Sequence, residues 1–412
     1  MPVQKSVAQT DLPIIRAHST TADVRDGSLF KKGFWNIDPA SRPDTYWADL
    51  PRKNHTVTMI TDIDSITFDV SFGKIYDFII LLHGKDSCYT RISAEYNGIS
   101  RYAEPAGRVP GTPDTVPFKL GGSRIYFKGS INGHPDIRIQ FDLGAGMSSI
   151  NERSIRKTGV KFDGKTSLSN SNGTNESPTS SSNRIEIAGL VWDQVTLIRT
   201  GNMGNEEDAI IGNSLFENKV IEINYDKLIM VLHDTLPAIP AGYVAYETHF
   251  IQHRPIIQAG ITVGGKIYTD EFLFDTGRDG NMVLRDNFFR KYPVWDEMKT
   301  ILNLGNKKTV VVSRLELGGL TFRNLLSPAF NPGKIRSESS NVLGNKLLNH
   351  FNVILDNQNG MIWLKPNTLQ KNKYPNWTDF RNRGILVLIG LAFLSAAGVL
   401  TLRKVRRNGS VS

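Results

Sequence analysis

Two aspartates in this chain occupy matching settings, and their side chains could do acid–base chemistry. The segment FDLG at 141–144 recurs 133 residues later as FDTG at 274–277. In both copies an apolar run leads into the aspartate, and the following glycine allows a tight turn. Two carboxylates held a few ångströms apart cannot both ionise comfortably, so one proton is shared. Such a pair can activate a water molecule while protonating a carbonyl oxygen.

The two segments belong to an internal duplication that spans roughly residues 124–367. RIEIAGL at 184–190 returns as RLELGGL at 314–320, and IIGN at 210–213 returns as VLGN at 342–345. The three landmarks keep their order and are offset by 133, 130 and 132 residues. Collinear repeats of this length predict two similar β-rich lobes, at 124–235 and 236–367. Lobes related by a pseudo-two-fold axis would bring the two carboxylates together.

On these motifs the core resembles the aspartic protease superfamily, in particular its retropepsin-like group with two fused lobes. It is also similar to bacterial two-lobe proteins, often from Bacteroidetes, that are described as aspartyl-protease-like. The resemblance implies a mostly β, two-lobed acid-protease-like β-barrel fold with Asp142 and Asp275 as the catalytic pair. It also implies that the active-site loops are supported by Gly144, Ala145, Thr276, Gly277, Ile210, Ile211, Gly212, Val342, Leu343 and Gly344.

Two features depart from the family pattern. The family has Thr or Ser after each aspartate, whose hydroxyl bonds across the two loops, but Leu143 has no hydroxyl. A buried hydrogen bond contributes only about 0.5–1.5 kcal/mol, so the fold should tolerate the loss, whereas catalysis is more sensitive to small misplacements. The family's closing hairpin, the flap, corresponds to the polar run at 167–183, which we interpret as a solvated loop rather than a mobile lid.

Two functional hypotheses follow. The first is a membrane-anchored aspartic endopeptidase that hydrolyses peptide or protein substrates and needs no cofactor or metal. The second is a non-catalytic protein that uses the same fold to bind a peptide or an envelope component. Leu143 and the plain flap favour the second, and the duplicated aspartate turns favour the first.

The N-terminal quarter predicts a separate β module. Residues 1–26 are polar and irregular, whereas 27–103 contains runs rich in Val, Ile, Thr, Tyr and Phe from Thr56 onward. The density of Pro and Gly at 104–123 predicts a linker. The single cysteine, Cys88, excludes an intramolecular disulfide and is expected to be a buried apolar residue.

Residues 384–402 form an uncharged, apolar run of 19 residues flanked by arginines and lysines. That length predicts a transmembrane helix, and the basic tail at 403–412 predicts a cytoplasmic C-terminus. The body would then be extracytoplasmic, with a signal peptide missing from the written start. A tail-anchored protein with a cytoplasmic body is the alternative.

The remaining signals are weaker. Residues 371–412 carry +7 of the net charge of +9. The rest of the chain therefore lacks the concentration of positive charge expected of a nucleic-acid-binding protein. His249 and His253 have no evident third ligand, and we expect no metal site. The sequence has no Gly-x-Ser-x-Gly motif, so it does not indicate a serine hydrolase of the common type that has this motif. Asp163 and Asp279 are interpreted as turn residues.

Overall fold

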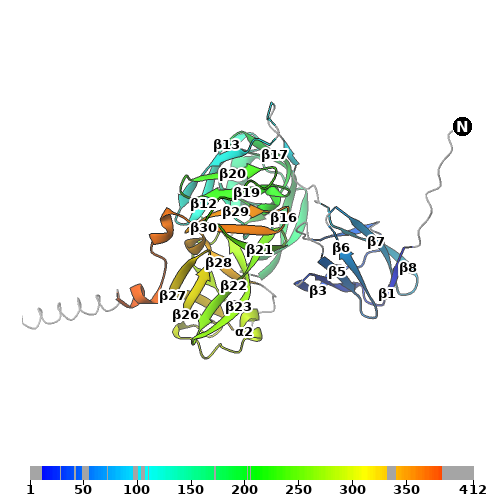
Figure 1. Ribbon diagram of the computed structural model, residues 1–412. Helices are drawn as coiled ribbons and strands as arrows, with labels where there is room; N and C mark the ends of the chain where they lie inside the picture. The colour runs from blue at the N-terminus through cyan, green and yellow to red at the C-terminus, as the bar shows by residue number, and fades with distance from the viewer. Residues whose placement is uncertain are drawn as a thin grey trace, which may run out of the picture.

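The computed structural model describes residues 12–382, apart from 28, 41–42, 49–54, 72, 96–100, 104–106, 110, 171–172, 202, 205 and 332–339. Regular structure in this part of the chain is mostly β-strand. Figure 1 shows an N-terminal module beside a larger body with two lobes, one above the other in that view.

The N-terminal module consists of two four-stranded sheets. They have the orders β1-β7-β8-β4 and β3-β2-β5-β6. Side chains alternate between the faces of each strand, so Val24, Met59 and Phe78 are buried in a core separate from that of the lobes. Cys88 belongs to this core and is buried, as expected. The strands are β1 (Ile14–Ala17), β2 (Thr21–Asp26), β3 (Leu29–Asn36), β4 (Asp44–Trp47), β5 (His55–Ile60), β6 (Ser65–Val70), β7 (Ile75–Leu82) and β8 (Asp86–Ser93).

The module begins earlier than the sequence predicted. Residues 14–26, expected to be irregular, form β1 and β2, and both strands alternate buried and more exposed side chains. β1 pairs with β7 in parallel, and β2 lies between β3 and β5. These strands were not predicted because they are short and carry charged residues on their outer faces. Their alternation of apolar and polar residues is therefore too brief to identify a strand.

The first lobe is a nine-stranded sheet whose main path runs β11-β12-β13-β18-β14-β17-β16-β15. β13 pairs with β18 in parallel, and β14 runs antiparallel to β18. The strands are β9 (Arg101–Ala103), β11 (Lys119–Gly121), β12 (Arg124–Ile131), β13 (His134–Phe141), β14 (Ser149–Asn151), β15 (Gly164–Asn170), β16 (Gly173–Ile187), β17 (Leu190–Thr200) and β18 (Ala209–Ile211). Its short helices are η1 (Glu152–Ser154), α1 (Ile155–Thr158) and η2 (Asn213–Phe216).

The second lobe repeats this arrangement. β23 pairs with β28 in parallel and β24 runs antiparallel to β28, as β13, β18 and β14 do in the first lobe. Its elements are β22 (Arg254–Val263), β23 (Lys266–Asp275), β24 (Met282–Val283), α2 (Asp286–Lys291), β25 (Thr300–Asn303), β26 (Lys307–Leu317), β27 (Leu320–Phe330), β28 (Asn341–Gly344) and α3 (Asn345–Leu348). The two copies of the sequence therefore have the same strand connections around the aspartates.

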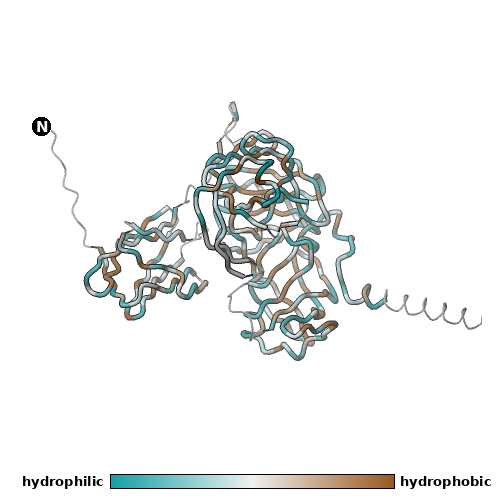
Figure 2. The backbone as a smooth tube through the Cα atoms, turned by 180° about the vertical axis from the view of Figure 1, so that it is seen from behind, coloured by the Kyte–Doolittle hydropathy of each residue, from teal (hydrophilic) through white to brown (hydrophobic). Residues whose placement is uncertain are grey.

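A run of hydrogen-bonded strands joins the lobes. Its order is β10-β20-β19-β29-β30-β21, and β19 of the first lobe pairs with β29 of the second, with Val220 opposite Asp356. The buried apolar residues of both lobes form one continuous cluster, seen as brown segments inside the body in Figure 2. The joining strands are β10 (Asp114–Pro117), β19 (Val220–Asn224), β20 (Ile229–His233), β21 (Val244–Ile251), β29 (Phe351–Asp356) and β30 (Met361–Pro366). This continuity fixes the position of one lobe relative to the other.

The sequence predicted a linker at 104–123, and this prediction is wrong for the C-terminal half of that segment. β10 pairs with β20, and β11 pairs with β12, so these residues belong to the body. Pro117 is tolerated because it occupies the last position of β10, an edge strand.

Within the described residues, no helix is long and apolar enough to cross a membrane. The predicted membrane segment at 384–402 and the basic tail at 403–412 lie outside the described residues.

Candidate active site

Each candidate aspartate lies at the end of a strand that is paired with a parallel neighbouring strand. Phe141, the last residue of β13, lies opposite Ile211 in β18, and the Asp142 N–H donates to the Ile211 carbonyl at 3.0 Å. Asp275, the last residue of β23, lies opposite Gly344 in β28. The apolar pairs Ile210–Ile211 and Val342–Leu343 thus hold the strands that deliver the carboxylates.

The two carboxyl groups meet at the junction of the lobes. The side chains of Asp142 and Asp275 are hydrogen-bonded to each other. A Cβ atom added at Gly144 would lie 2.6 Å from Asp275 Cγ and 3.0 Å from Asp142 Oδ1. One added at Gly277 would overlap the Asp142 carboxyl. Glycine is therefore required at both turns because any side chain would force the carboxyls apart.

Backbone amides orient the pair. Gly144 N–H donates to Asp142 Oδ1 at 2.7 Å, and Gly277 N–H donates to the same atom at 3.1 Å. Arg278 N–H donates to Asp275 Oδ1 at 2.9 Å. Both aspartates remain partly exposed, so solvent reaches the pair. The arrangement can hold one proton between two carboxyls that face solvent.

One hydroxyl ties the two aspartate loops together. The Leu143 N–H donates to Thr276 Oγ1 at 2.9 Å, and Thr276 Oγ1 approaches the Phe141 carbonyl at 3.4 Å as a donor. Thr276 and Leu143 are both fully buried. The reciprocal bond cannot form because the Leu143 side chain has no hydroxyl to accept from the Thr276 N–H. The cross-loop link is therefore one-sided, and the Leu143 side chain packs into the core instead.

The glycines that follow the apolar pairs make room for the aspartate loops. A Cβ at Gly212 would collide with the Ala145 carbonyl, and one at Gly344 would collide with the Gly280 carbonyl. The Ala145 N–H donates to the Asp142 carbonyl at 3.1 Å, which closes the first turn. The loops can pack this closely against β18 and β28 only where no side chain intervenes.

Two asparagines that sequence reasoning did not assign to the site bind across the lobes. Asn213 Nδ2 of the first lobe donates to the His253 carbonyl of the second at 2.9 Å. Asn345 Nδ2 of the second lobe donates to the carbonyl of Ser123, which precedes β12 in the first. Both directly follow the apolar-apolar-glycine element, with an offset of 132 residues. Their repetition in the sequence was the signal that could have identified them.

Further contacts anchor the second aspartate loop to the first lobe. Arg124 Nε donates to the Gly277 carbonyl at 3.0 Å. Asp279, predicted to be only a turn residue, accepts from Ser123 Oγ at 2.7 Å and from its N–H at 3.1 Å. The prediction missed this because the partner is 156 residues away in the sequence.

Burial and mutual repulsion perturb both carboxyls. Burial raises the pKa of Asp142 well above its usual value, and the negative charge of Asp275 raises it further. Burial also raises the pKa of Asp275, but the hydrogen bond from Asp142 and the positive charge of Arg278 oppose the rise. The shared proton is therefore held mainly by Asp142, and Asp275 carries the charge of the pair.

The flap region differs from the prediction of a solvated loop. β15 and β16 form a long antiparallel hairpin, with Gly164 opposite Thr179 and Asn170 opposite Gly173. The polar run lacks the apolar alternation that identifies strands from sequence, but backbone pairing with β17 extends the sheet into this region. The second lobe has the corresponding hairpin β25–β26.

The two histidines considered as a metal pair each lie beside a glutamate. His253 Nδ1 is 2.6 Å from Glu217 Oε1, and His249 Nε2 is 3.6 Å from Glu271 Oε1. Within the described residues, no cluster of three or more His, Cys, Asp or Glu side chains could hold a metal ion.

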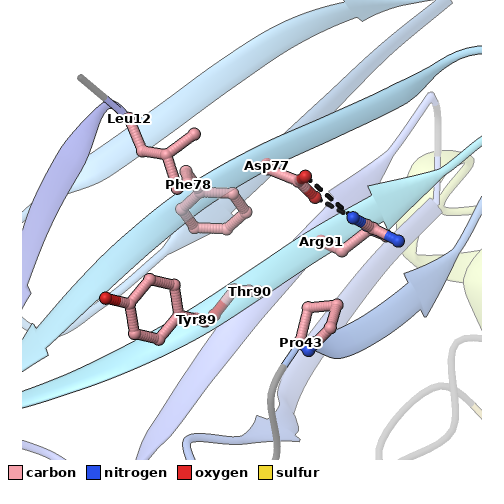
Figure 3. Close-up of a pocket in the computed structure, with 7 residues that line it drawn as sticks. All are labelled: Leu12, Pro43, Asp77, Phe78, Tyr89, Thr90 and Arg91. Carbon is pink, nitrogen blue, oxygen red and sulfur yellow. Dashed lines mark hydrogen bonds and ion pairs between the residues drawn. The ribbon is translucent and has the colours of Figure 1, made fainter. Parts of the chain in front are cut away.

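A pocket of about 340 Å³ lies on the N-terminal module (Figure 3). Its charged residues neutralise each other, since Arg91 Nε and Nη2 donate to the two Asp77 carboxylate oxygens at 2.6 and 2.8 Å. Its lining is completed by Leu12, Pro43, Phe78, Tyr89 and Thr90. Without a free acid or base, it offers no alternative to the carboxyl pair for hydrolysis.

A family model and a solved structure are each similar to part of this chain. Residues 127–218 match the family described as gag-polyprotein putative aspartyl protease, a segment that includes Asp142 and Gly212. Among solved structures, the crystal structure of aspartic proteinase from Irpex lacteus matches with a TM-score of 0.45 and 12% identity. That match covers 63% of this chain and 99% of the fungal one. None of the curated proteins matches significantly. Over residues 127–218 the chain is therefore similar to aspartyl-protease-like proteins.

The raised pKa values predict a pH-dependent penalty on stability. A carboxyl whose folded pKa is raised destabilises the fold as pH rises from its unfolded value, about 4, toward its folded value. Asp142→Asn removes this penalty and keeps a donor for Asp275. We therefore expect the variant to exceed the wild type in Tm at pH 7 but not at pH 4. Each pKa unit corresponds to about 1.4 kcal/mol, and about 1 kcal/mol shifts the Tm of a domain of 150–250 residues by about 2–4 °C.

The matched control is Asp136→Asn in the same lobe. Asp136 is exposed, and its hydrogen bond from Lys128 lowers its pKa, so its replacement should not raise the Tm at pH 7. Thermal unfolding at both pH values measures the effect. An equal Tm difference for Asp142→Asn at pH 4 and pH 7 would show that the carboxyl pair carries no repulsion in the folded state.

Proposed function

We propose that this chain is an aspartic endopeptidase that hydrolyses peptide bonds through a water activated by Asp142 and Asp275. The observation that carries the proposal is the hydrogen-bonded pair of carboxyls at the junction of two duplicated lobes. The family match over residues 127–218 supports it. The substrate is a peptide or protein, and neither a metal nor a cofactor takes part.

In the proposed mechanism the carboxyls have different roles. Asp275, the more acidic of the two, takes a proton from the water as the water attacks the peptide carbonyl carbon. Asp142 donates its proton to the carbonyl oxygen, which gives a neutral tetrahedral diol. Collapse of this diol, with proton transfer to the leaving nitrogen, breaks the C–N bond and restores the pair. The Gly144 and Gly277 amides hold Asp142 in position throughout.

The test is cleavage of a diverse peptide library by the purified full chain from acidic to neutral pH, read by mass spectrometry. We expect cleavage that is strongest at acidic pH and sensitive to pepstatin. Asp275→Asn should reduce it by about 100-fold or more, since a general acid or base contributes about 10²–10⁴-fold. Equal cleavage by wild type and Asp275→Asn would assign the activity to a contaminant or to another site.

A non-catalytic peptide-binding protein is the second candidate, and the buried Leu143 is the observation that favours it. Without a second hydroxyl the loops are held by one cross-link, and small misplacements of reacting groups can cost about 10²-fold in rate. Peptide binding that persists in the Asp142→Asn, Asp275→Asn double variant, with no turnover by the wild type, would establish this candidate.

The substitution Leu143→Thr separates these two candidates. By the pseudo-symmetry of the lobes, the hydroxyl that this substitution introduces would accept from the Thr276 N–H and complete the cross-loop link. We expect a several-fold rise in kcat over the matched variant Leu143→Val, which has the shape of threonine without its hydroxyl. Peptide cleavage and thermal unfolding of both variants measure the effect. If the Thr variant is no faster than the Val variant, the loops are built around leucine and the symmetric template does not apply.

We also propose that residues 384–402 anchor the protein in a membrane, with the body on the extracytoplasmic side. The apolar length and the flanking basic residues support this. We expect the full chain to remain with the membrane fraction after a high-salt wash and a chain ending at residue 380 to be released. Release of both chains would contradict the proposed membrane anchor. Treatment of intact cells with an added protease tests on which side of the membrane the body lies, since only an extracytoplasmic body would be degraded.

A further inference from the structure

Two arginines of the second lobe lie close to Asp275. Arg278 is in the loop that follows the aspartate, and Arg285 directly precedes α2. Their positive charges act on Asp275 and on each other. The corresponding loop of the first lobe has Ala145 in the place of Arg278. The loop after Asp275 therefore carries a positive side chain that the loop after Asp142 lacks.

Neither guanidinium makes a hydrogen bond or an ion pair in the part of the chain that the structure describes. No ion pair or side-chain hydrogen bond involves Arg278 or Arg285, and the Nε atom of each is buried without an acceptor. Asp286 lies 2.8 Å from Arg290 and Asp279 binds Ser123, and neither acid forms an ion pair with Arg278 or Arg285 within the described residues. The two cations thus retain unused donors.

The outer nitrogens of both arginines are accessible. Each residue is partly exposed, and only the Nε atom of each is an unpartnered buried donor. Arg285 lies over the ring of Phe330 at 5.1 Å, and Lys307 lies over the same ring at 5.6 Å. The aromatic ring fixes one face of the Arg285 guanidinium and leaves its edge free to donate.

A bound anion would reduce the electrostatic repulsion between the two guanidinium groups. Two like charges that are partly removed from water repel each other, and burial lowers the pKa of both arginines. A planar guanidinium matches a carboxylate through paired N–H donors, which distinguishes it from a lysine ammonium.

We propose that Arg278 and Arg285 form a subsite for an acidic side chain of the substrate, so that peptides with Glu or Asp within a few residues of the cleaved bond are preferred. The substrate class rests on the proposed function, whereas the anion preference rests on the two arginines. The asymmetry of charge places this acidic residue on one side of the cleaved bond only.

The experiment uses fluorescein-labelled peptides with one Glu moved stepwise along an otherwise neutral scaffold, each paired with a Gln version. Binding to the full chain is measured by fluorescence polarisation, and cleavage is measured by mass spectrometry. At one Glu position we expect about tenfold tighter binding than for Gln, in line with a charge-assisted hydrogen bond. Arg285→Gln should abolish this ratio. Arg314→Gln, an exposed arginine of the same lobe that pairs with Glu316, should preserve it.

The binding measurement tests the subsite, and the cleavage measurement tests the proposed peptidase activity. Glu-dependent binding without any cleavage would support the subsite and overturn the proposed peptidase activity. Cleavage with equal Kd and equal rates for every Glu and Gln pair would overturn the subsite and leave the peptidase standing. A Glu preference that survives in Arg285→Gln and in Arg278→Gln would place the anion contact elsewhere and also overturn the assignment. Thermal unfolding of each variant confirms that it is folded.

Discussion

The hydroxyl of Thr276 is the contact on which the geometry of this site depends. It accepts the Leu143 N–H at 2.9 Å and faces the Phe141 carbonyl, so one side chain holds both ends of the first aspartate turn against the second. It does so while fully buried, where an unmet hydrogen bond costs more than at the surface. In a symmetric site two hydroxyls would share this role. Here the strands and asparagines around the loops must supply the remaining rigidity.

That rigidity comes from contacts that cross between the lobes. The β19–β29 pairing joins the two sheets, and Asn213 and Asn345 each bind a carbonyl of the opposite lobe. The repulsion between two buried carboxyls works against these contacts, and it is one reason that the pKa of Asp142 rises. The proximity of the two carboxyls thus reduces stability locally, as is common at functional sites. The glycines at 144 and 277 are part of the same arrangement because only they allow the carboxyls to meet.

The sequence predicted the parts of the molecule that are repeated and apolar. The FDLG and FDTG segments, the apolar pairs behind them and the strands β5–β8 have strong local patterns, and they form as expected. β1, β2 and β10 are short and interrupted by charges or prolines, so their pairing depends on neighbours distant in the sequence. The β15–β16 hairpin is polar and was interpreted as a loop. The roles of Asp279 and Arg124 required knowledge of which residues face each other across the lobes.

The duplicated lobes are symmetric in their strands and asymmetric in their chemistry. The second lobe supplies the hydroxyl of Thr276 and the charge of Arg278, where the first has Leu143 and Ala145. The hydroxyl organises the loops, and the charge favours ionisation of Asp275 over Asp142. A dyad of identical carboxyls has no intrinsic preference for which one carries the proton, so the preference must come from such surroundings. Because both differences lie next to the aspartates, divergence of the two copies has made the carboxyls of the two lobes differ in acidity without altering the fold that positions them.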